Sequence, residues 1–235
     1  MTTKKQEKIK FSKAFWVANT VELFERAAYY GVFIVITLYL SRILGFNDIQ
    51  AASIAGIFSA CLYLLPTFAG ALADKIGFRN SMLLAFTLLT CGYLGLAVYP
   101  TWLQSAGLVE YSTTTTFTGL LESNLQYGII PIMALIVCGG AFIKSVISGT
   151  VAKETTPETR AKGFSIFYAM VNIGAFSGKT IVKPLREALG NEGLITLNYF
   201  SASMTFLALL SHWFLLQKAL SIRARARRSG KSGTP

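Results

Sequence analysis

The chain has 235 residues, of which 53% are hydrophobic and only 14% are charged. Soluble domains carry about a quarter of charged residues, so this composition excludes a disordered protein and a disulfide-rich secreted domain and disfavours a water-soluble globule. The net charge of +11 would indicate nucleic-acid binding in a soluble protein, but in a membrane protein it usually reflects cytoplasmic loops rich in Lys and Arg.

Six stretches are long and apolar enough to cross a bilayer as helices, which takes about 20 residues each. In chain order they are residues 14–40, 49–73, 81–99, 128–149, 163–183 and 196–217. We therefore expect an all-α polytopic membrane protein. It would have a cytoplasmic segment over 1–13, a bundle of six transmembrane helices over 14–217, and a basic, Gly/Ser-ended cytoplasmic segment over 218–235. This last segment would be a disordered tail or linker, or a juxtamembrane anchor for anionic lipid.

The basic residues alternate between the segments that join these spans. Segments 1–13, 74–80, 150–162 and 218–235 together hold 16 of the 22 Lys and Arg residues, whereas the three segments on the other side hold two. Because cytoplasmic loops carry the excess of Lys and Arg, this pattern predicts that both termini are cytoplasmic. The expected location is the cell (inner) membrane.

The first span contains three ionisable residues, Glu22, Glu25 and Arg26. Their spacing places them on one helical face, and charges inside a span are costly enough that their default interpretation is functional. One Arg cannot neutralise two carboxylates, so we expect another cation or a bound proton. Lys144 of the fourth span lies at a comparable depth and is the candidate. The alternative is a structural ion network that only locks the helices together.

The segment after the second span reads Gly70-Ala-Leu-Ala-Asp74-Lys75-Ile-Gly77-Phe-Arg79. It resembles the signature loop of the major facilitator superfamily, G-x-L-A-D-[RK]-x-G-x-[RK]. The resemblance implies a gating loop. Its glycines would allow close packing and a tight turn, and its charged residues would bond to neighbouring helix ends.

Within that superfamily the chain resembles the proton-dependent oligopeptide transporters. Three segments carry the resemblance: Glu-Leu-Phe-Glu-Arg-Ala-Ala-Tyr-Tyr-Gly from Glu22, Phe-Ile-Lys ending at Lys144, and the stretch from Gly163 to Gly174. The resemblance implies that Glu22, Glu25, Arg26 and Lys144 couple transport to protons. It also implies that Tyr29, Tyr30, Lys144 and Asn172 bind the substrate.

Several positions depart from the family pattern. Ala27 replaces an aromatic residue, and Phe33 stands where members that bind dipeptides commonly carry an Arg. Ser145 and Val146 replace the Pro-Asn that often follows the lysine. Without the Arg a substrate carboxylate would lose a bidentate partner, so proton coupling is better supported than a di- or tripeptide substrate.

Superfamily transporters have two six-helix halves, each a 3+3 inverted repeat, with the site between the halves. We therefore expect the N-terminal half of a proton-coupled symporter for peptides or peptide-like solutes that works by alternating access. Its partners would be membrane lipid, the solute, and a C-terminal six-helix half or a second copy, but no nucleic acid. The proton would be the coupling ion, with no cofactor.

The alternatives are a major facilitator transporter for a different small solute, a non-transporting membrane scaffold, and a truncated fragment. The cluster of charges in the first span separates a transporter from a scaffold, which does not need it. The sequence has no nucleophile–base pair, metal-binding cluster or phosphate loop, so we do not expect an enzyme.

Overall fold

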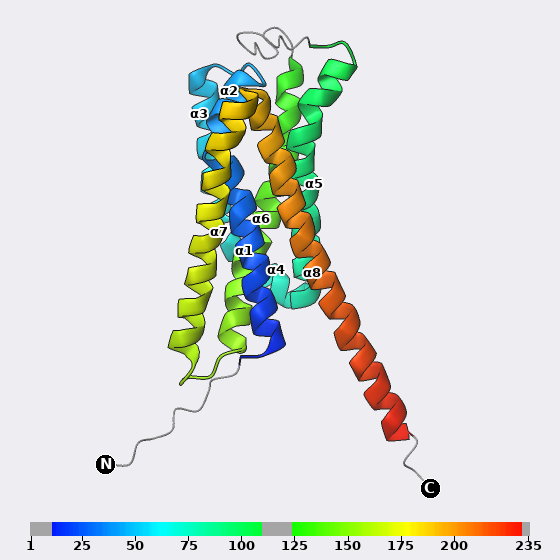
Figure 1. Cartoon of the computed structure of the whole chain (residues 1–235). Coiled ribbons are helices and arrows are strands. Elements are labelled where there is room, and N and C mark those ends of the chain that lie inside the picture. Colours follow the sequence, from blue (N-terminus) through cyan, green and yellow to red (C-terminus); the bar gives the residue numbers. More distant parts are fainter. Residues whose placement is uncertain (1–10, 110–123, 232–235) are drawn as a thin grey trace, which may run out of the picture.

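A computed structural model describes residues 11–109 and 124–231, with side chains up to residue 214. The described residues form eight α-helices and one 3₁₀ helix, with no strand. In chain order they are α1 (Lys13–Phe33), α2 (Ile36–Arg42), α3 (Asp48–Leu64), α4 (Pro66–Ile76), α5 (Phe78–Ser105), η1 (Asn124–Gly128), α6 (Ile129–Lys153), α7 (Arg160–Leu189) and α8 (Glu192–Lys231). Figure 1 shows them as one elongated bundle. Most of the expected N-terminal segment lies outside the described residues.

Each expected span coincides with one helix or with one bent pair of helices. The first corresponds to α1 and α2, which meet at 43°, and the second to α3 and α4, which meet at 47°. Among the described residues, three helices are long and apolar enough to cross a membrane, or up to five if each bent pair is one span. The helix α7 does not meet this criterion, because Asn172, Lys179 and Lys183 interrupt its apolar sequence.

The last helix is longer than the sequence predicted. We expected the sixth span to end at residue 217 and a disordered tail to follow, but the backbone of α8 continues as a helix to Lys231. The residues from 218 onward include Ala, Leu, Arg and Lys, which are strong helix formers. Within this segment, glycine and proline, which disfavour helix, occur only from Gly230 onward. Local helix propensity therefore overrides the compositional signal of a linker.

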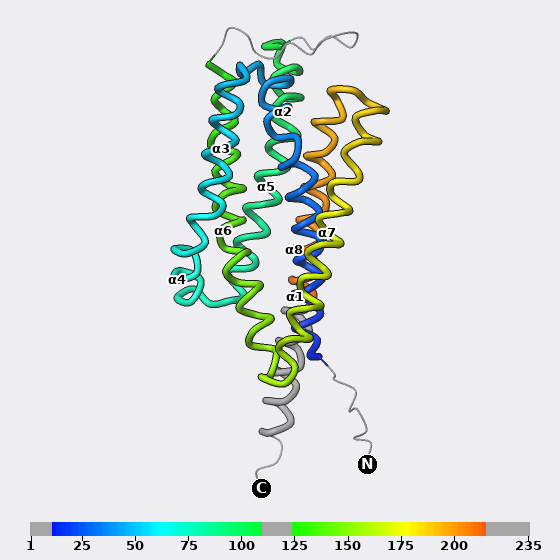
Figure 2. Tube along the Cα trace, turned by 90° about the vertical axis from the view of Figure 1, so that its left-hand side faces the viewer, coloured from blue at the N-terminus to red at the C-terminus, as the bar shows by residue number. Residues whose placement is uncertain are grey.

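The helices pack in a pattern that repeats between the two halves of the bundle. The helix α5 packs on α6 and α8, α1 packs on α7 and α8, and α4 packs on α6. Exchanging the first three spans with the last three converts the α5–α6 contact into α1–α8 and the α4–α6 contact into α1–α7. Figure 2 shows α3, α4 and α6 on one side and α1, α7 and α8 on the other. This arrangement is the 3+3 repeat expected from the sequence.

Small residues bring α1 and α7 into close contact. A methyl group at Gly178 would lie 3.0 Å from the backbone nitrogen of Gly31 and 3.1 Å from the carbonyl carbon of Ala27. One turn earlier, a methyl group at Gly174 would lie 2.8 Å from Cβ of Arg26. Glycines four residues apart allow helix backbones to approach in membranes. They therefore hold α7 against the segment of α1 that carries the charged residues.

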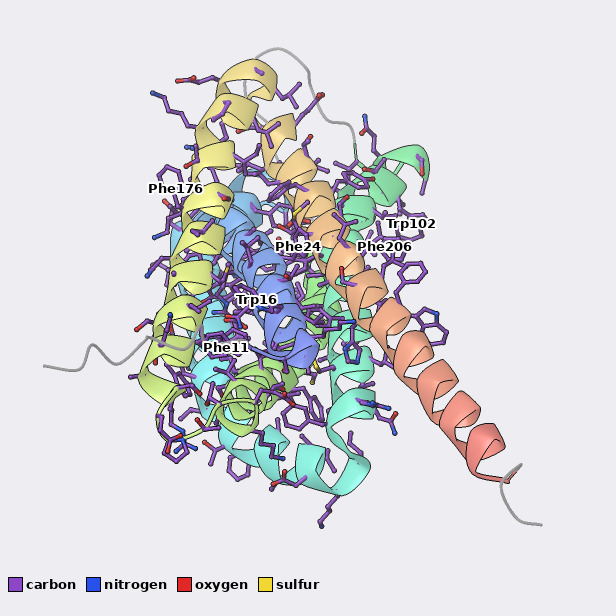
Figure 3. All side chains as sticks on the ribbon, turned by 60° about the horizontal axis from the view of Figure 1, so that its bottom comes forward. Phe11, Trp16, Phe24, Trp102, Phe176 and Phe206 are labelled. Carbon is purple, nitrogen blue, oxygen red and sulfur yellow. The ribbon has the colours of Figure 1, made fainter. Side chains whose placement is uncertain are left out.

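The bundle has a packed apolar interior and an apolar exterior. Tyr39, Tyr93 and Phe86 are among the largest fully buried side chains. Other large apolar side chains point outward, including Phe176 of α7, which is 71% exposed, and Trp102 of α5, which is 53% exposed (Figure 3). An outer surface of this kind suits hydrocarbon rather than water.

Candidate functional site

A buried ion cluster lies in the middle of α1. Glu22, Glu25 and Arg26 are 6%, 3% and 9% exposed. Nε of Arg26 lies 3.1 Å from Oε1 of Glu22, and Nη2 of Arg26 forms an ion pair with Oε2 of Glu25. The three residues share one helical face, as their spacing predicts. Since one guanidinium serves two carboxylates, the cluster with all three groups ionised carries one excess negative charge.

Tyr29 continues this face and contacts two cations. Its side chain is buried, and its ring centroid lies 5.3 Å from the guanidinium carbon of Arg26 and 6.0 Å from Nζ of Lys144. Phe33 stacks on the same ring at 4.9 Å. The Tyr29 hydroxyl has no hydrogen-bond partner among the described residues. The ring thus links the ion cluster of α1 to the lysine of α6.

Among the described residues, Lys144 forms no ion pair with a carboxylate, so the pairing expected from the sequence is not seen in this arrangement. Its Nζ donates a hydrogen bond of 3.0 Å to the carbonyl oxygen of Leu62 and lies 4.1 Å from the ring centroid of Tyr63. Pro66 follows Leu62 by four residues and has no N–H, so the Leu62 carbonyl lacks its helical donor. That open carbonyl and the Tyr63 ring together hold the ammonium group on the α3 side of the site.

Most of the predicted gating loop is helical, because its residues up to Ile76 belong to α4 and α5 begins at Phe78, so that only Gly77 lies between the two helices. Gly77 ends α4 with φ of 84°, a left-handed conformation that favours glycine, so the tight turn expected there is present. Asp74, Lys75 and Arg79 are all exposed and form no ion pair within the described residues, so the expected bonds to helix ends are not made. The carbonyl oxygen of Arg79 instead lies 3.4 Å from Nε2 of His212 on α8.

Of the other two predicted substrate residues, Tyr30 contacts Tyr29 and Asn172 has no such contact within the described residues. Tyr30 is half-buried and contacts the Tyr29 ring edge-on, with 5.1 Å between the ring centroids. Nζ of Lys179 lies 4.7 Å from the centroid of the Tyr30 ring. Asn172 is exposed on α7 and makes no hydrogen bond with the described residues. Tyr30 and Lys144 are therefore connected to the ion cluster through the Tyr29 ring. Asn172 has no such connection within the described residues.

Reasoning from the sequence missed the contribution of α3 and α4. Neither Tyr63 nor Pro66 was selected, and Ser145 was noted only as a departure from a family pattern. The signal was present, because a proline inside an apolar run predicts a break and an open carbonyl four residues earlier. Its partner on another helix could not be identified without the packing.

Comparison with known proteins identifies the family. The model of the Major Facilitator Superfamily matches residues 18–234 of this chain. The chain belongs to this superfamily. Its relatives are therefore transporters rather than enzymes, and the all-helical fold is that of a polytopic membrane protein.

The curated relatives of this superfamily member include peptide permeases. It is 31% identical over 171 residues to dipeptide and tripeptide permease A of Salmonella typhi, covering 70% of the chain and 29% of the permease. It is 27% identical over 181 residues to dipeptide and tripeptide permease B of Yersinia enterocolitica serotype O:8, covering 76% of the chain and 32% of the permease. The chain thus spans about a third of the length of these relatives.

Solved structures agree with this assignment. One is a chain reported in work on substrate recognition in proton dependent oligopeptide transporters. It matches with a TM-score of 0.66 and 25% identity, over 85% of this superfamily member and 40% of that chain. A peptide transporter mutant in complex with sulfate matches in fold with a TM-score of 0.70 and 23% identity, over 94% of this chain and 44% of the other.

Proposed function

We propose that the chain forms one six-helix wall of a proton-coupled symporter for peptides or peptide-like solutes. In superfamily transporters the substrate site lies between two six-helix bundles that rock against each other. The second bundle would come from a C-terminal half or from a second copy of the chain. The curated relatives named as dipeptide and tripeptide permeases support a peptide-like solute.

The observation that carries the proposal is the buried cluster of two carboxylates with one guanidinium. Glu22 and Glu25 share Arg26, so uptake of one proton would neutralise the cluster. Ionisable groups inside a membrane protein are expensive and are retained along ion and substrate pathways. A membrane scaffold would need no such cluster. Lys144 stands within reach of the same Tyr29 ring, where its positive charge would attract a substrate carboxylate.

We further propose that the protein lies in the cell (inner) membrane and that both of its termini face the cytoplasm. The alternation of Lys and Arg along the chain supports this orientation, and the curated relatives are bacterial. On this assignment α7 crosses the bilayer as a fifth span despite its modest hydropathy. Its polar residues would face a second bundle rather than lipid.

A different small solute is the second candidate, and Phe33 is the observation that favours it. Phe33 stacks on Tyr29, so the site offers an aromatic surface where peptide-binding members commonly carry an Arg. Competition between a labelled dipeptide and non-peptide solutes of similar size separates the two substrates. A peptide substrate predicts that other dipeptides compete and that the non-peptide solutes do not.

The test of coupling is uptake into membrane vesicles prepared from the native cells, which supply any partner bundle. With an inward proton gradient, we expect a dipeptide to accumulate in wild-type vesicles and not in vesicles that carry Glu25→Gln. Exchange of labelled for unlabelled substrate at equal concentration should persist in the variant, because exchange needs the site but no net proton movement.

Glu187→Gln is the matched control, since Glu187 forms only an exposed pair with Lys183 at 3.7 Å. Accumulation in this variant should equal that of the wild type. If Glu25→Gln vesicles accumulate substrate as the wild type does, with the same dependence on pH, the assignment of Glu25 to proton coupling is wrong.

A further inference from the structure

The break between α3 and α4 is held by two side chains of α6. Nζ of Lys144 donates to the carbonyl oxygen of Leu62 at 3.0 Å, on the α3 side of the break. Oγ of Ser145 donates to the carbonyl oxygen of Pro66 at 2.6 Å, on the α4 side. Consecutive residues of one helix thus bond to both sides of a 47° bend in its neighbour.

Proline chemistry explains why the first of these bonds is needed. The carbonyl of Leu62 would normally accept from the backbone nitrogen of residue 66, but Pro66 has no N–H. A buried carbonyl without a donor is costly, especially in a membrane. The Leu62 carbonyl therefore accepts a strong, charge-assisted hydrogen bond from the Lys144 ammonium group, and this bond stabilises Lys144 in the observed position.

Close packing fixes the helices at the break. Leu62 is buried, and a methyl group at Gly140 of α6 would lie 2.7 Å from Cδ2 of Leu62. On the other side, a methyl group at Gly70 would lie 3.4 Å from Oγ of Ser145. Gly140 therefore lets α6 approach closely enough for its side chains to reach the α3–α4 backbone, whereas the contact at Gly70 is an ordinary van der Waals distance.

We propose that Lys144 and Ser145 form a clamp that sets the angle between α3 and α4, and through it the position of the gating loop. The loop residues Gly70, Asp74 and Lys75 belong to α4, which begins at the clamped proline. Lys144 also contacts the Tyr29 ring beside the ion cluster. A charge that draws Lys144 away from Leu62, such as a substrate carboxylate or an unneutralised glutamate, would release α4.

This consequence for transport rests on the proposed function, but the clamp itself does not. Leu72 lies six residues beyond the break, or about 9 Å along the helix axis. Straightening the 47° bend would move it by up to about 7 Å. Such a displacement is large enough to measure between two spin labels, without any transport assay.

The experiment uses the full chain with Cys61, Cys91 and Cys138 replaced by alanine. Spin labels are attached at positions 72 of α4 and 165 of α7, which are both exposed. We expect one narrow distance distribution in the otherwise unchanged chain. Lys144→Met and Ser145→Ala should each shift or broaden it, and Ser145→Thr, which keeps the hydroxyl, should restore it. Lys179→Met and Ser148→Ala, whose side chains contact the Tyr30 ring and the Lys144 carbonyl of α6 itself, should leave it unchanged.

Pro66→Ala provides the decisive arm. An alanine at this position supplies the missing N–H, so the Leu62 carbonyl no longer needs Lys144. We expect Lys144→Met to have no further effect on the distance once Pro66→Ala is present. The clamp is refuted if Lys144→Met leaves the distribution unchanged with proline at position 66, or changes it equally with alanine there. Proton-driven uptake can succeed or fail in either case, so the two proposals are tested separately.

Discussion

Replacing Gly178 with alanine should weaken the contact between α1 and α7. The added methyl group would lie 3.0 Å from the Gly31 nitrogen and 3.1 Å from the Ala27 carbonyl carbon. Both atoms belong to the backbone of α1 and cannot rotate away, so the helices must separate. Overpacking of this kind costs about 1–3 kcal/mol. The higher helix propensity of alanine offsets about 1 kcal/mol of that cost.

Gly56→Ala is the matched control, because nothing lies within 4 Å of a methyl group at Gly56 of α3. It gains the same helix propensity without the clash. Gly178→Ala should therefore have a free energy of unfolding about 1–3 kcal/mol lower than Gly56→Ala, which is about 5- to 150-fold in the unfolding equilibrium. Titration of the purified chain with SDS, followed by circular dichroism, measures the difference. Equal free energies of unfolding for the two variants would refute the reasoning.

Two further predictions concern packing and orientation. Oγ of Ser201 donates to the carbonyl oxygen of Ala28 at 2.8 Å in the buried α1–α8 contact, so Ser201→Ala should lower the free energy of unfolding by about 0.6 kcal/mol, the mean for hydrogen bonds between membrane helices. Ser203→Ala is its control, since Ser203 is exposed and bonds only within its own helix, and equal effects of the two variants in the same SDS titration would contradict the assignment. For orientation, cysteines replacing Glu187 and Glu158 in a cysteine-free chain should react differently with an impermeant maleimide. The first should be labelled in intact cells and the second only after permeabilisation, and the opposite pattern would show that the chain is inverted.

The sequence was most informative where structure depends on near neighbours. The placement of Glu22, Glu25 and Arg26 on one face follows from helical periodicity alone. The turn at Gly77 follows from the conformations open to glycine. Both features depend only on residues close together in the sequence, so they could be predicted without knowing how the helices pack.

The partner of Lys144 could not be predicted in the same way. Charge balance suggested a carboxylate as the partner, because it considers only charged side chains and leaves out backbone acceptors. The acceptor found is a backbone carbonyl made available by a proline in a different helix. Any helix with an internal proline has such a carbonyl, but only the packing of α3 against α6 shows which side chain reaches it.

The two bent segments are unevenly distributed between the repeats, so the two halves of the bundle match in their helix contacts but not in the course of their backbones. Both breaks occur in the first three spans, at the α1–α2 and α3–α4 junctions, whereas α6, α7 and α8 are each a single uninterrupted helix. Two repeats with matching contacts therefore differ in shape. Each of the first two spans changes direction within the bundle, whereas each span of the second repeat is one continuous helix.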